Sequence, residues 1–413
     1  MTAPAPAGGV LSGLRVVEGC AFVAAPLGGM TLAQLGADVI RFDPIGGGLD
    51  ARRWPLSPDG AHSLFWDGLN KGKRSIAVDL RSSRGQELLT RVITAPGADA
   101  GIFSTNFPAR GWLAYDTLRA HRDDLIMVAL TGRRDGGSEV DYTVNPQLGV
   151  PAFTGPAHDD MPVNHVLPAW DLIAGHQVAL AILAAERHRA RTGQGQLVQL
   201  SLKDVGLATL GHLGFIAEAT LHGRDRARYG NYLFGAFGRD FTCADGVRVM
   251  VVGLTESQWT ALCTATDMRD AMDALARQVR LDFSKEGDRF LAREPIADVL
   301  APWFAARPFA EVRDAFTRHR VAWGPYRTLR DALAADPDAS LDNPLFGELS
   351  TGAGAAYLAP GSTLGFGAVP RRPVHAAPRL GEHTDEILLT LAGVTEAELG
   401  RLHDEGVVSG PVS

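Results

Sequence analysis

The chain has 413 residues, a formal net charge of −7 and a hydrophobic content of 46%. At roughly 100–200 residues per domain, this length predicts two domains, and the acidic balance disfavours a nucleic-acid partner. No apolar run approaches the roughly 18 residues of a membrane span, and Met1–Gly9 has neither the basic start nor the apolar stretch of a signal peptide. The three cysteines are dispersed and form no metal motif or disulfide framework. We expect a cytoplasmic protein with no membrane partner.

The chain begins with a strand–helix–strand pattern. Leu14–Glu18 predicts a strand, Gly19–Pro26 a turn-rich loop, Leu27–Leu35 a helix and Ala37–Phe42 the next strand. Such a βαβ unit is typical of a parallel sheet.

Further strands and helices alternate along the first half of the chain. The predicted elements are strands Ser75–Asp79, Ala100–Thr105, Leu125–Leu130 and Gln196–Leu200, and helices Arg84–Ile93, Leu172–Arg191 and Asp204–Leu221. The fold class is therefore α/β, with a Rossmann-like, doubly wound large domain.

The pattern changes near Phe241. A strand pair around Asp245-Gly246 and short helices over Ser257–Ala335 indicate a second, smaller α+β domain. The tail returns to longer helices at Thr384–Leu391 and Glu396–His403.

Several cofactor and catalytic motifs are disfavoured. Gly28-Gly29 lacks the G-x-G-x-x-G spacing, which weakens a nicotinamide site with Asp43 on the ribose. Arg74 follows Gly72-Lys73 where a P-loop needs Ser or Thr. No two histidines lie four residues apart and no G-x-S-x-G elbow occurs, so we expect neither a zinc helix nor a hydrolase triad.

Basic residues near strand ends and one aspartate remain. The basic residues are either solvated surface groups or ligands for phosphates, which arginine binds well; they are Arg41, Lys73, Arg74, Arg81 and Arg110. Asp171 lies between an extended stretch and a long helix. Asp is a favoured N-cap residue, so cap preference alone favours a capping role over a nucleophilic one, although Ala174 leaves no capping box.

The sequence resembles the family III CoA transferases over nearly its whole length. The resemblance lies in segments that occur in the family's order, namely Leu11–Glu18, Ala25-Pro26, Leu35–Asp43, Asn70–Leu80, Asn106-Phe107, Trp170–Gly175, Ala181–Ala185, Thr192–Gln196 and Gly381–Glu386. It implies that Asp171 is the catalytic nucleophile and that CoA, carried as part of the substrate, is the only cofactor-like group.

The resemblance also implies CoA contacts. The implied residues are Phe22, Val23, Arg41, Lys73, Arg74, Val78, Arg81, Asn106, Phe107 and Arg110, with Arg81 and Arg110 on phosphates. Pro44 stands where one branch of the family has a nucleotide-gripping arginine, so Arg41 is expected to compensate. That branch's glycine-rich lid has no counterpart, and Gly230–Gly238 is expected to take its place.

Three segments are similar to a narrower branch, whose members move CoA from the C1 to the C4 carboxyl of mesaconate in the 3-hydroxypropionate carbon-fixation cycle. They are Val140–Gly149, Val163–Asp171 and Gly230–Asp240. The implied substrate is mesaconyl-CoA or a related acyl-CoA thioester, transferred through an aspartyl anhydride and an aspartyl-CoA thioester. Arg52, Arg53, Asn145 and His165 are candidates to hold the free carboxylate.

Three alternatives stay open. A related enzyme could move CoA between two different acids, an acyl-CoA racemase would need a histidine where Val140 stands, and a non-catalytic protein could merely bind CoA esters. Retention of Asp171 argues against the last.

The resemblance further implies an interlocked homodimer with a discontinuous large domain. The expected boundaries are 1–215 plus 345–413 for the large CoA-binding domain, 228–335 for the small domain, and 216–227 and 336–344 for linkers.

Overall fold

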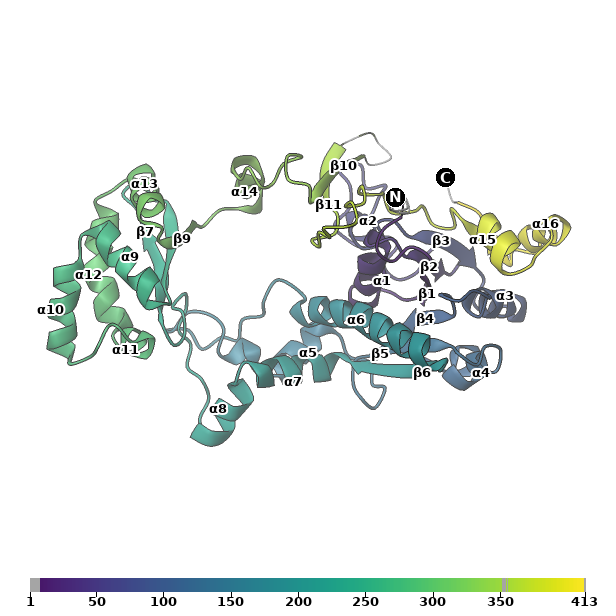
Figure 1. Ribbon diagram of the computed structural model, residues 1–413, viewed down its shortest axis with the longest axis horizontal. Helices are drawn as coiled ribbons and strands as arrows, with labels where there is room; N and C mark the ends of the chain where they lie inside the picture. The colour runs from purple at the N-terminus through teal and green to yellow at the C-terminus, as the bar shows by residue number, and fades with distance from the viewer. Residues whose placement is uncertain (1–7, 351–353, 355, 412–413) are drawn as a thin grey trace. The chain divides into compact units, whose positions relative to one another are not determined.

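The computed structural model describes residues 8–350, 354 and 356–411, so most of the Ala/Pro-rich start lies outside the described residues. The chain forms two compact units. Unit 1 comprises Met1–Leu148, Val166–Ala217 and Pro337–Ser413, and unit 2 comprises Gly149–His165 and Glu218–Asp336. Figure 1 labels their helices and strands.

A seven-stranded sheet forms the centre of unit 1. Its strands are β1 (Arg15–Gly19), β2 (Asp38–Asp43), β3 (Arg74–Val78), β4 (Ile102–Thr105), β5 (Ile126–Thr131), β6 (Gln196–Ser201) and β12 (Val408–Ser409). The order is β12-β3-β2-β1-β4-β5-β6, and all neighbours pair in parallel except β12 with β3. The predicted doubly wound α/β fold with a parallel sheet is confirmed.

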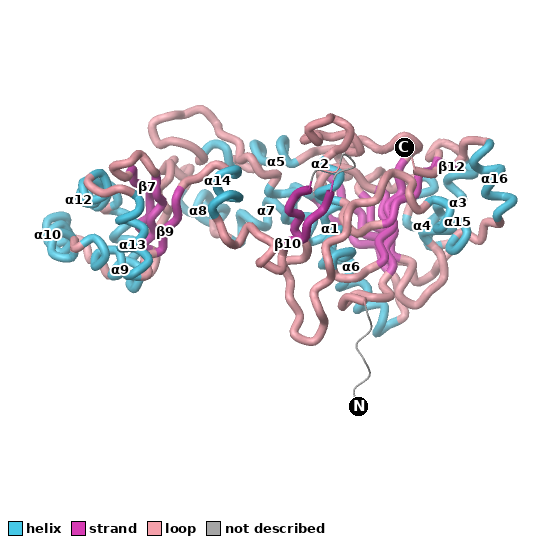
Figure 2. The backbone as a smooth tube through the Cα atoms, turned by 90° about the horizontal axis from the view of Figure 1, so that it is seen from above, coloured by secondary structure: helices cyan, strands magenta, loops and turns pink. Residues whose placement is uncertain are grey.

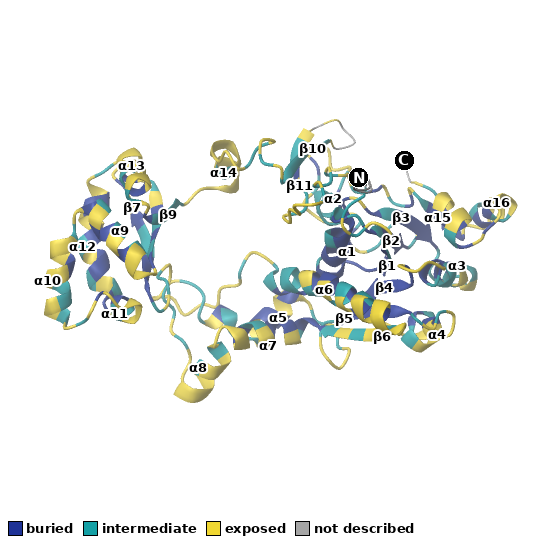
Figure 3. Ribbon diagram, in the orientation of Figure 1, coloured by how far each residue is buried: buried dark blue, intermediate teal, exposed yellow. Residues whose placement is uncertain are grey.

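Helices cover both faces of this sheet. Those of unit 1 are α1 (Ala24–Gln34), α2 (Leu64–Leu69), α3 (Ser83–Ile93), α4 (Tyr115–Arg119), α5 (Asp141–Gln147), α6 (Ala169–Thr192), α7 (Leu202–His212), α15 (Thr384–Leu391) and α16 (Glu396–Asp404), with a 3₁₀ turn η1 (Gly111–Leu113). Figure 2 shows α1 and α6 on one side of the strands and α3, α4 and α15 on the other. The strands between these layers are largely buried (Figure 3), as expected for parallel strands covered on both faces.

Helices α1 and α6 approach each other through glycines. A Cβ atom added at Gly175 of α6 would lie 2.8 Å from the carbonyl oxygen of Ala24, and one added at Gly28 of α1 would lie 2.6 Å from Cγ1 of Val178. Because both helices run antiparallel to the strands they precede, their N-termini lie at the carboxyl edge of the sheet. The contact therefore sets the second turn of α6 beside the start of α1.

Unit 2 is an α+β unit with its own core. It contains β7 (Phe237–Thr242), β8 (Arg248–Gly253), β9 (Ala322–Pro325), η2 (Val150–Ala152), α9 (Glu256–Thr266), α10 (Arg269–Val279), α11 (Glu286–Leu291), α12 (Arg293–Ala305), α13 (Phe309–His319) and α14 (Leu329–Ala335). The three strands pair antiparallel, and β7 and β8 flank the predicted Asp245-Gly246 turn. Buried aromatic residues such as Phe304 and Phe316 fill the core.

The structure corrects several sequence-based boundaries. The predicted helix Asp204–Leu221 is two helices, α7 and α8 (Phe215–His222), because Gly214 between them has a φ of +79° that ends the first helix. Part of α8 lies in the predicted linker 216–227. Residues 149–165, expected in the large domain, group with unit 2.

Three short strands were also not predicted. The hairpin of β10 (Phe346–Ser350) and β11 (Ala356–Pro360) precedes the tail, and the two-residue strand β12 extends the edge of the sheet. Across the described helices, none is long and apolar enough to cross a membrane.

The glycine contact between α1 and α6 makes a stability prediction. Gly175→Ala should lower the unfolding free energy by about 1–3 kcal/mol, because its methyl group would meet backbone that cannot move aside. Thermal unfolding of the variant measures this loss.

The matched control is Gly400→Ala in α16, where an added Cβ meets nothing within 4 Å. That change should stabilise by up to about 1 kcal/mol through helix propensity. Equal melting temperatures for Gly175→Ala and the wild type would contradict the proposed tight contact.

Candidate active site

Asp171 lies in the first turn of α6, and it does not cap the helix. The cap position is Pro168, and Asp171 is the third helical residue. The capping acceptor comes from another helix: Oδ2 of Asp141 accepts the backbone N–H of Trp170 at 2.7 Å and that of Asp171 at 3.2 Å. The N-cap interpretation of Asp171 is therefore wrong, and its carboxyl group is not used for capping.

Helix α5 holds the start of α6 through two side chains. Asp141, at the first position of α5, is only 1% exposed. One turn later, Oδ1 of Asn145 accepts the indole N–H of Trp170 at 3.2 Å. Asn145, predicted to hold the substrate carboxylate, thus contacts Trp170. Asp141 was missed because an isolated aspartate after an extended stretch carries no sequence signal for this role.

The carboxyl group of Asp171 has an unusual affinity for its proton. Partial burial, and to a smaller extent the nearby negative charge of Asp141, together raise its pKa to about 7. Within the described part of the chain, no lysine or arginine forms an ion pair with Asp171. A partly buried carboxyl group whose pKa lies near neutral pH is a candidate for catalysis.

A short loop, Cys20–Val23, follows the carboxyl end of β1 and leads into α1. The amide of Asn106 clamps it: its Oδ1 accepts the N–H of Ala21 at 3.0 Å, and its Nδ2 donates to the carbonyl of Ala21 at 2.8 Å. Phe22 has a φ of +68°, which is uncommon for a residue other than glycine. Its N–H donates to Oδ2 of Asp50 at 3.0 Å.

Six of the residues predicted to contact CoA follow the carboxyl ends of β1, β3 and β4. They are Phe22, Val23, Arg81, Asn106, Phe107 and Arg110. Because these strands are parallel, the six lie at one edge of the sheet. Arg81 and Arg110 are exposed, and neither guanidinium pairs with a carboxylate among the described residues. These two cations are available to an anionic ligand.

The other four lie elsewhere, and the geometry does not support CoA contacts by their side chains. Arg41 is fully buried and bound to Asp43 and Asp50. Lys73 is buried in an ion pair with Glu18 and also donates to Asn70 at 3.0 Å. Val78 is part of the apolar core, and Arg74, at the amino end of β3, pairs with Asp38 and Glu386. Buried charges need such partners, because desolvation of an unpaired ion is costly.

The remaining substrate candidates lie in two places. Arg52 and Arg53 are exposed and follow β2 in the chain. The guanidinium carbon of Arg53 lies 5.5 Å from the ring centre of Phe22 and 5.2 Å from that of Phe65. His165 belongs to unit 2. Val140, where a racemase would need a histidine, has no group that can transfer a proton.

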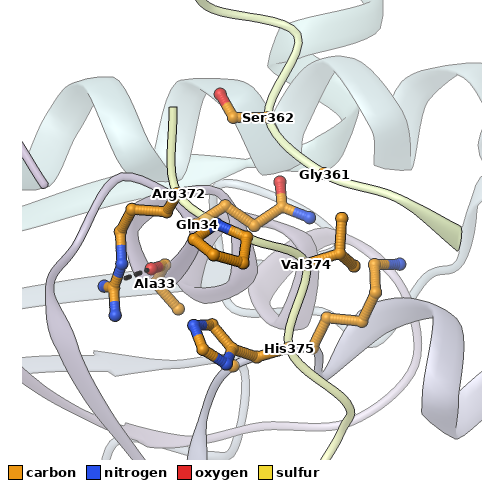
Figure 4. Close-up of a pocket in the computed structure, with 10 residues that line it drawn as sticks. Ala33, Gln34, Gly361, Ser362, Arg372, Val374 and His375 are labelled. Carbon is orange, nitrogen blue, oxygen red and sulfur yellow. Dashed lines mark hydrogen bonds between the residues drawn. The ribbon is translucent and has the colours of Figure 1, made fainter. Parts of the chain in front are cut away.

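A small pocket lies away from these residues (Figure 4). It is lined by Ala33, Gln34, Lys71, Gly72, Gly361, Ser362, Arg372, Pro373, Val374 and His375. The pocket lies at the C-terminal end of α1, which is about 15 Å from its N-terminal end at 1.5 Å per residue. Its arginine donates to the last turn of α1, so this pocket is separate from the site around Asp171.

A candidate carboxyl nucleophile thus lies in the first turn of α6, and two arginines without carboxylate partners in the described chain lie at the carboxyl edge of the same parallel sheet. Such an arrangement is chemically able to transfer an acyl group from an anionic substrate. The family model for CoA-transferase family III matches residues 11–384, and the chain belongs to this family.

Known relatives narrow the comparison. The chain is 67% identical over 403 residues to the 2-methylfumaryl-CoA isomerase of Chloroflexus aurantiacus, covering 98% of each chain. It is 28% identical to the succinyl-CoA:mesaconate CoA-transferase of Haloarcula hispanica, covering 92% of this chain and 96% of that one. Among solved structures, a CaiB/BaiF family protein from Brucella suis matches with a TM-score of 0.75 at 25% identity, covering 93% and 100%.

The raised pKa of Asp171 makes a prediction about pH. A nucleophilic carboxyl must be ionised, so kcat/KM should fall as the pH drops below about 7. Asp141→Asn removes the neighbouring negative charge but keeps an oxygen to accept the two N–H groups. This variant should move the fall in kcat/KM to lower pH, as a pH–rate profile would measure.

Stability provides the matching check. Between the ordinary value of 3.8 and about 7, the folded chain keeps a proton on Asp171 that the unfolded chain releases. Stability contributed by this group is therefore lost as pH rises through that window, and Asp171→Asn should flatten the loss. If kcat/KM has the same pH dependence in Asp141→Asn as in the wild type, Asp141 does not raise the pKa of Asp171.

Proposed function

We propose that this protein catalyses intramolecular transfer of CoA, converting mesaconyl-C1-CoA (2-methylfumaryl-CoA) into mesaconyl-C4-CoA (3-methylfumaryl-CoA). The observation that carries the proposal is the 67% identity to a 2-methylfumaryl-CoA isomerase across 98% of both chains. The partly buried carboxyl group of Asp171, which lies in the first turn of α6 and caps no N–H group, supports it chemically.

The first half of the reaction makes an enzyme-bound thioester. The Asp171 carboxylate attacks the C1 thioester carbonyl, the C–S bond breaks, and CoA leaves as a thiolate, giving a mixed anhydride. The thiolate then attacks the aspartyl carbonyl of the anhydride. This step releases mesaconate as a dicarboxylate and leaves CoA on Asp171 as a thioester.

The second half repeats these steps on the other carboxyl group. The C4 carboxylate attacks the aspartyl thioester and expels thiolate, and the thiolate attacks the C4 carbonyl of the new anhydride. Asp171 leaves as a carboxylate, so no net proton or electron is consumed. Mesaconate must stay bound and turn between the halves, and holding it removes much of the entropic barrier to the second attack.

The oxyanions formed in these steps need donors other than the start of α6. The backbone N–H groups of Ala169 and Leu172 donate to Leu167 and Pro168, and those of the two residues between them donate to Asp141. These N–H groups are therefore not available to stabilise oxyanions.

The start of α1 is the better candidate. The backbone N–H groups of Ala24 and Ala25 have no hydrogen-bond acceptor within the described part of the chain. They lie at the positive end of the helix dipole, next to α6 through the Gly175 contact. Preorganised donors of this kind stabilise developing negative charge.

The phosphates and the free carboxylate of the substrate need cations. Arg81 and Arg110 fit the CoA phosphates, because both are exposed and free of carboxylate partners in the described structure. Arg52 and Arg53, exposed in the loop that holds Phe22, fit the free carboxylate.

An intermolecular transferase is the second candidate. It is favoured by one observation: relatives at 28% identity include a succinyl-CoA:mesaconate CoA-transferase. The same aspartyl chemistry would then pass CoA to a second acid.

The assembly is part of the proposal. We expect an interlocked homodimer in the cytoplasm, with no resident cofactor and no nucleic-acid or membrane partner. Exposed large apolar side chains in unit 1, such as Leu180, Leu207 and Leu213, support a covering partner.

Replacement of the nucleophile tests the chemistry. Asp171→Ala should lower kcat for conversion of the C1 to the C4 thioester by at least about 1,000-fold, since no other group forms the anhydride. The wild type incubated with mesaconyl-CoA should also carry an adduct on Asp171, detected by mass spectrometry.

The matched control is Asp204→Ala. Asp204 occupies the same third position of its helix, α7, but is exposed, so this variant should keep wild-type turnover. Substantial turnover in Asp171→Ala would remove Asp171 from the mechanism.

Isotope exchange distinguishes the two candidate functions. Labelled free mesaconate added during turnover should not enter the CoA ester if the acid never leaves the site. Product isolated by chromatography should therefore carry little label, and rapid incorporation would favour the intermolecular transferase.

A further inference from the structure

Phe22 adopts a left-handed backbone conformation, with a φ of +68°, that is unfavourable for a residue with a side chain. Such a conformation persists only where the surroundings fix it. The loop Cys20–Val23 is fixed at two successive residues, by Asn106 at Ala21 and by Asp50 at Phe22. Nothing in the proposed chemistry assigns a role to Asp50.

The carboxylate of Asp50 is divided between two tasks. Its Oδ2 accepts the N–H of Phe22 at 3.0 Å, and its Oδ1 accepts from Nη2 of Arg41 at 2.7 Å. Asp50 is 1% exposed, so both contacts are shielded from water.

Arg41 holds the Asp50 carboxylate in place through this hydrogen bond. It donates to both oxygens of Asp43 at 2.9 and 3.0 Å and to Oδ1 of Asn70 at 3.2 Å. Its guanidinium carbon lies 4.4 Å from the ring centre of Trp66. A guanidinium with all these partners has a single orientation, which fixes the position of Asp50.

The ring of Phe22 is held from the same loop as Asp50. Arg53, three residues after Asp50, places its guanidinium 5.5 Å from that ring. The backbone and the ring of Phe22 therefore both depend on the segment 50–53.

This loop lies beside the nucleophile. Gly175 contacts Ala24, the first residue of α1, and Asp171 lies four residues before Gly175, about 6 Å along the helix. Val23 and Phe22 directly precede Ala24 in the chain. Along the axis of α6, Asp171 therefore lies beside the Cys20–Val23 loop.

We propose that Asp50 is a positioning residue: it holds Phe22 in the left-handed conformation in which this loop receives the CoA part of the substrate. The inference rests on the proposed function, because it takes the loop beside Asp171 as a CoA contact. Asp50 acts through Phe22 and touches no reacting atom.

The test uses Asp50→Asn, which has the same shape. One side of an amide is a donor, so no orientation satisfies both Arg41 and the Phe22 N–H. We expect KM for mesaconyl-CoA, and Kd for CoA alone measured by calorimetry, to rise about tenfold through loss of one shielded hydrogen bond. The value of kcat should change less than about twofold, because Asp171 is untouched.

Asp43→Asn is the matched control. Asp43 is equally buried and binds the same guanidinium, but it does not contact Phe22. The amide keeps one oxygen for Arg41, and Asn70 and Asp50 still hold the same guanidinium. The replacement should therefore lower the melting temperature without changing the Kd for CoA by more than about twofold.

Phe22→Gly separates positioning from a general structural role. Glycine adopts positive φ freely, so in this background Asp50→Asn should weaken CoA binding by less than about twofold. The same penalty in both backgrounds would overturn the proposal, as would a wild-type Kd in Asp50→Asn.

Failure to fold is also informative. If Asp50→Asn alone does not fold, restoration of folding by Phe22→Gly supports the proposal, and failure to restore it assigns Asp50 to Arg41 alone and overturns the proposal. A wild-type protein that binds CoA but does not isomerise mesaconyl-CoA would defeat the proposed function and leave the binding test of Asp50 intact.

Discussion

The close approach of α1 and α6 is the constraint on which the site depends. Cβ atoms added at Gly28 and Gly175 would lie 2.6 and 2.8 Å from atoms of the facing helix, so side chains there would force the two helices apart. Their N-terminal turns would then lie further apart at the carboxyl edge of the sheet. Asp171 comes from α6, the free N–H groups come from α1, and the Phe22 loop is the entry to α1. One backbone contact therefore sets the nucleophile, the donors and the loop beside one another.

Electrostatics divides the charged residues of unit 1 into two sets. Arg41 and Lys73 are buried and neutralised by carboxylates, and they shape the loops from inside. Arg81 and Arg110 are exposed without carboxylate partners in the described chain. An acidic protein can thus bind a nucleotide-bearing ligand with a few local cations, since phosphate recognition depends on nearby groups and long-range repulsion is screened by salt. The overall charge of −7 excludes a broad basic surface and does not exclude such a site.

The parallel sheet could be predicted from the sequence, because buried strands such as β5 are continuous apolar runs. Helix α15 also has the predicted bounds Thr384–Leu391. The sequence does not separate α7 from α8, because glycine is common in this chain and only the φ of Gly214 marks the break. The burial of individual charged residues could not be predicted from the sequence either. Arg41 and Arg81 both follow apolar stretches, yet Arg41 is buried and Arg81 is exposed. The capping role of Asp141 depends on a contact with residues about 30 positions away, which local patterns do not encode.

The raised pKa of Asp171 fits a group that must both attack and leave. A carboxylate with an ordinary pKa near 4 is a much weaker nucleophile than a thiolate, whose parent thiol titrates near 8.5. Transfer to such a carboxylate would be strongly uphill. Partial burial and the charge of Asp141 bring the pKa of Asp171 to about 7. The difference between this pKa and that of a thiol is then less than about two units. The acyl group can then pass between sulfur and oxygen with a smaller free-energy difference at each step. The same near-match lets Asp171 leave the second anhydride when thiolate attacks. One consequence is that a fraction of the protein molecules carries a proton on Asp171 at neutral pH. The raised pKa that brings the intermediates closer in free energy therefore also sets the lower limit of the pH range in which the enzyme works.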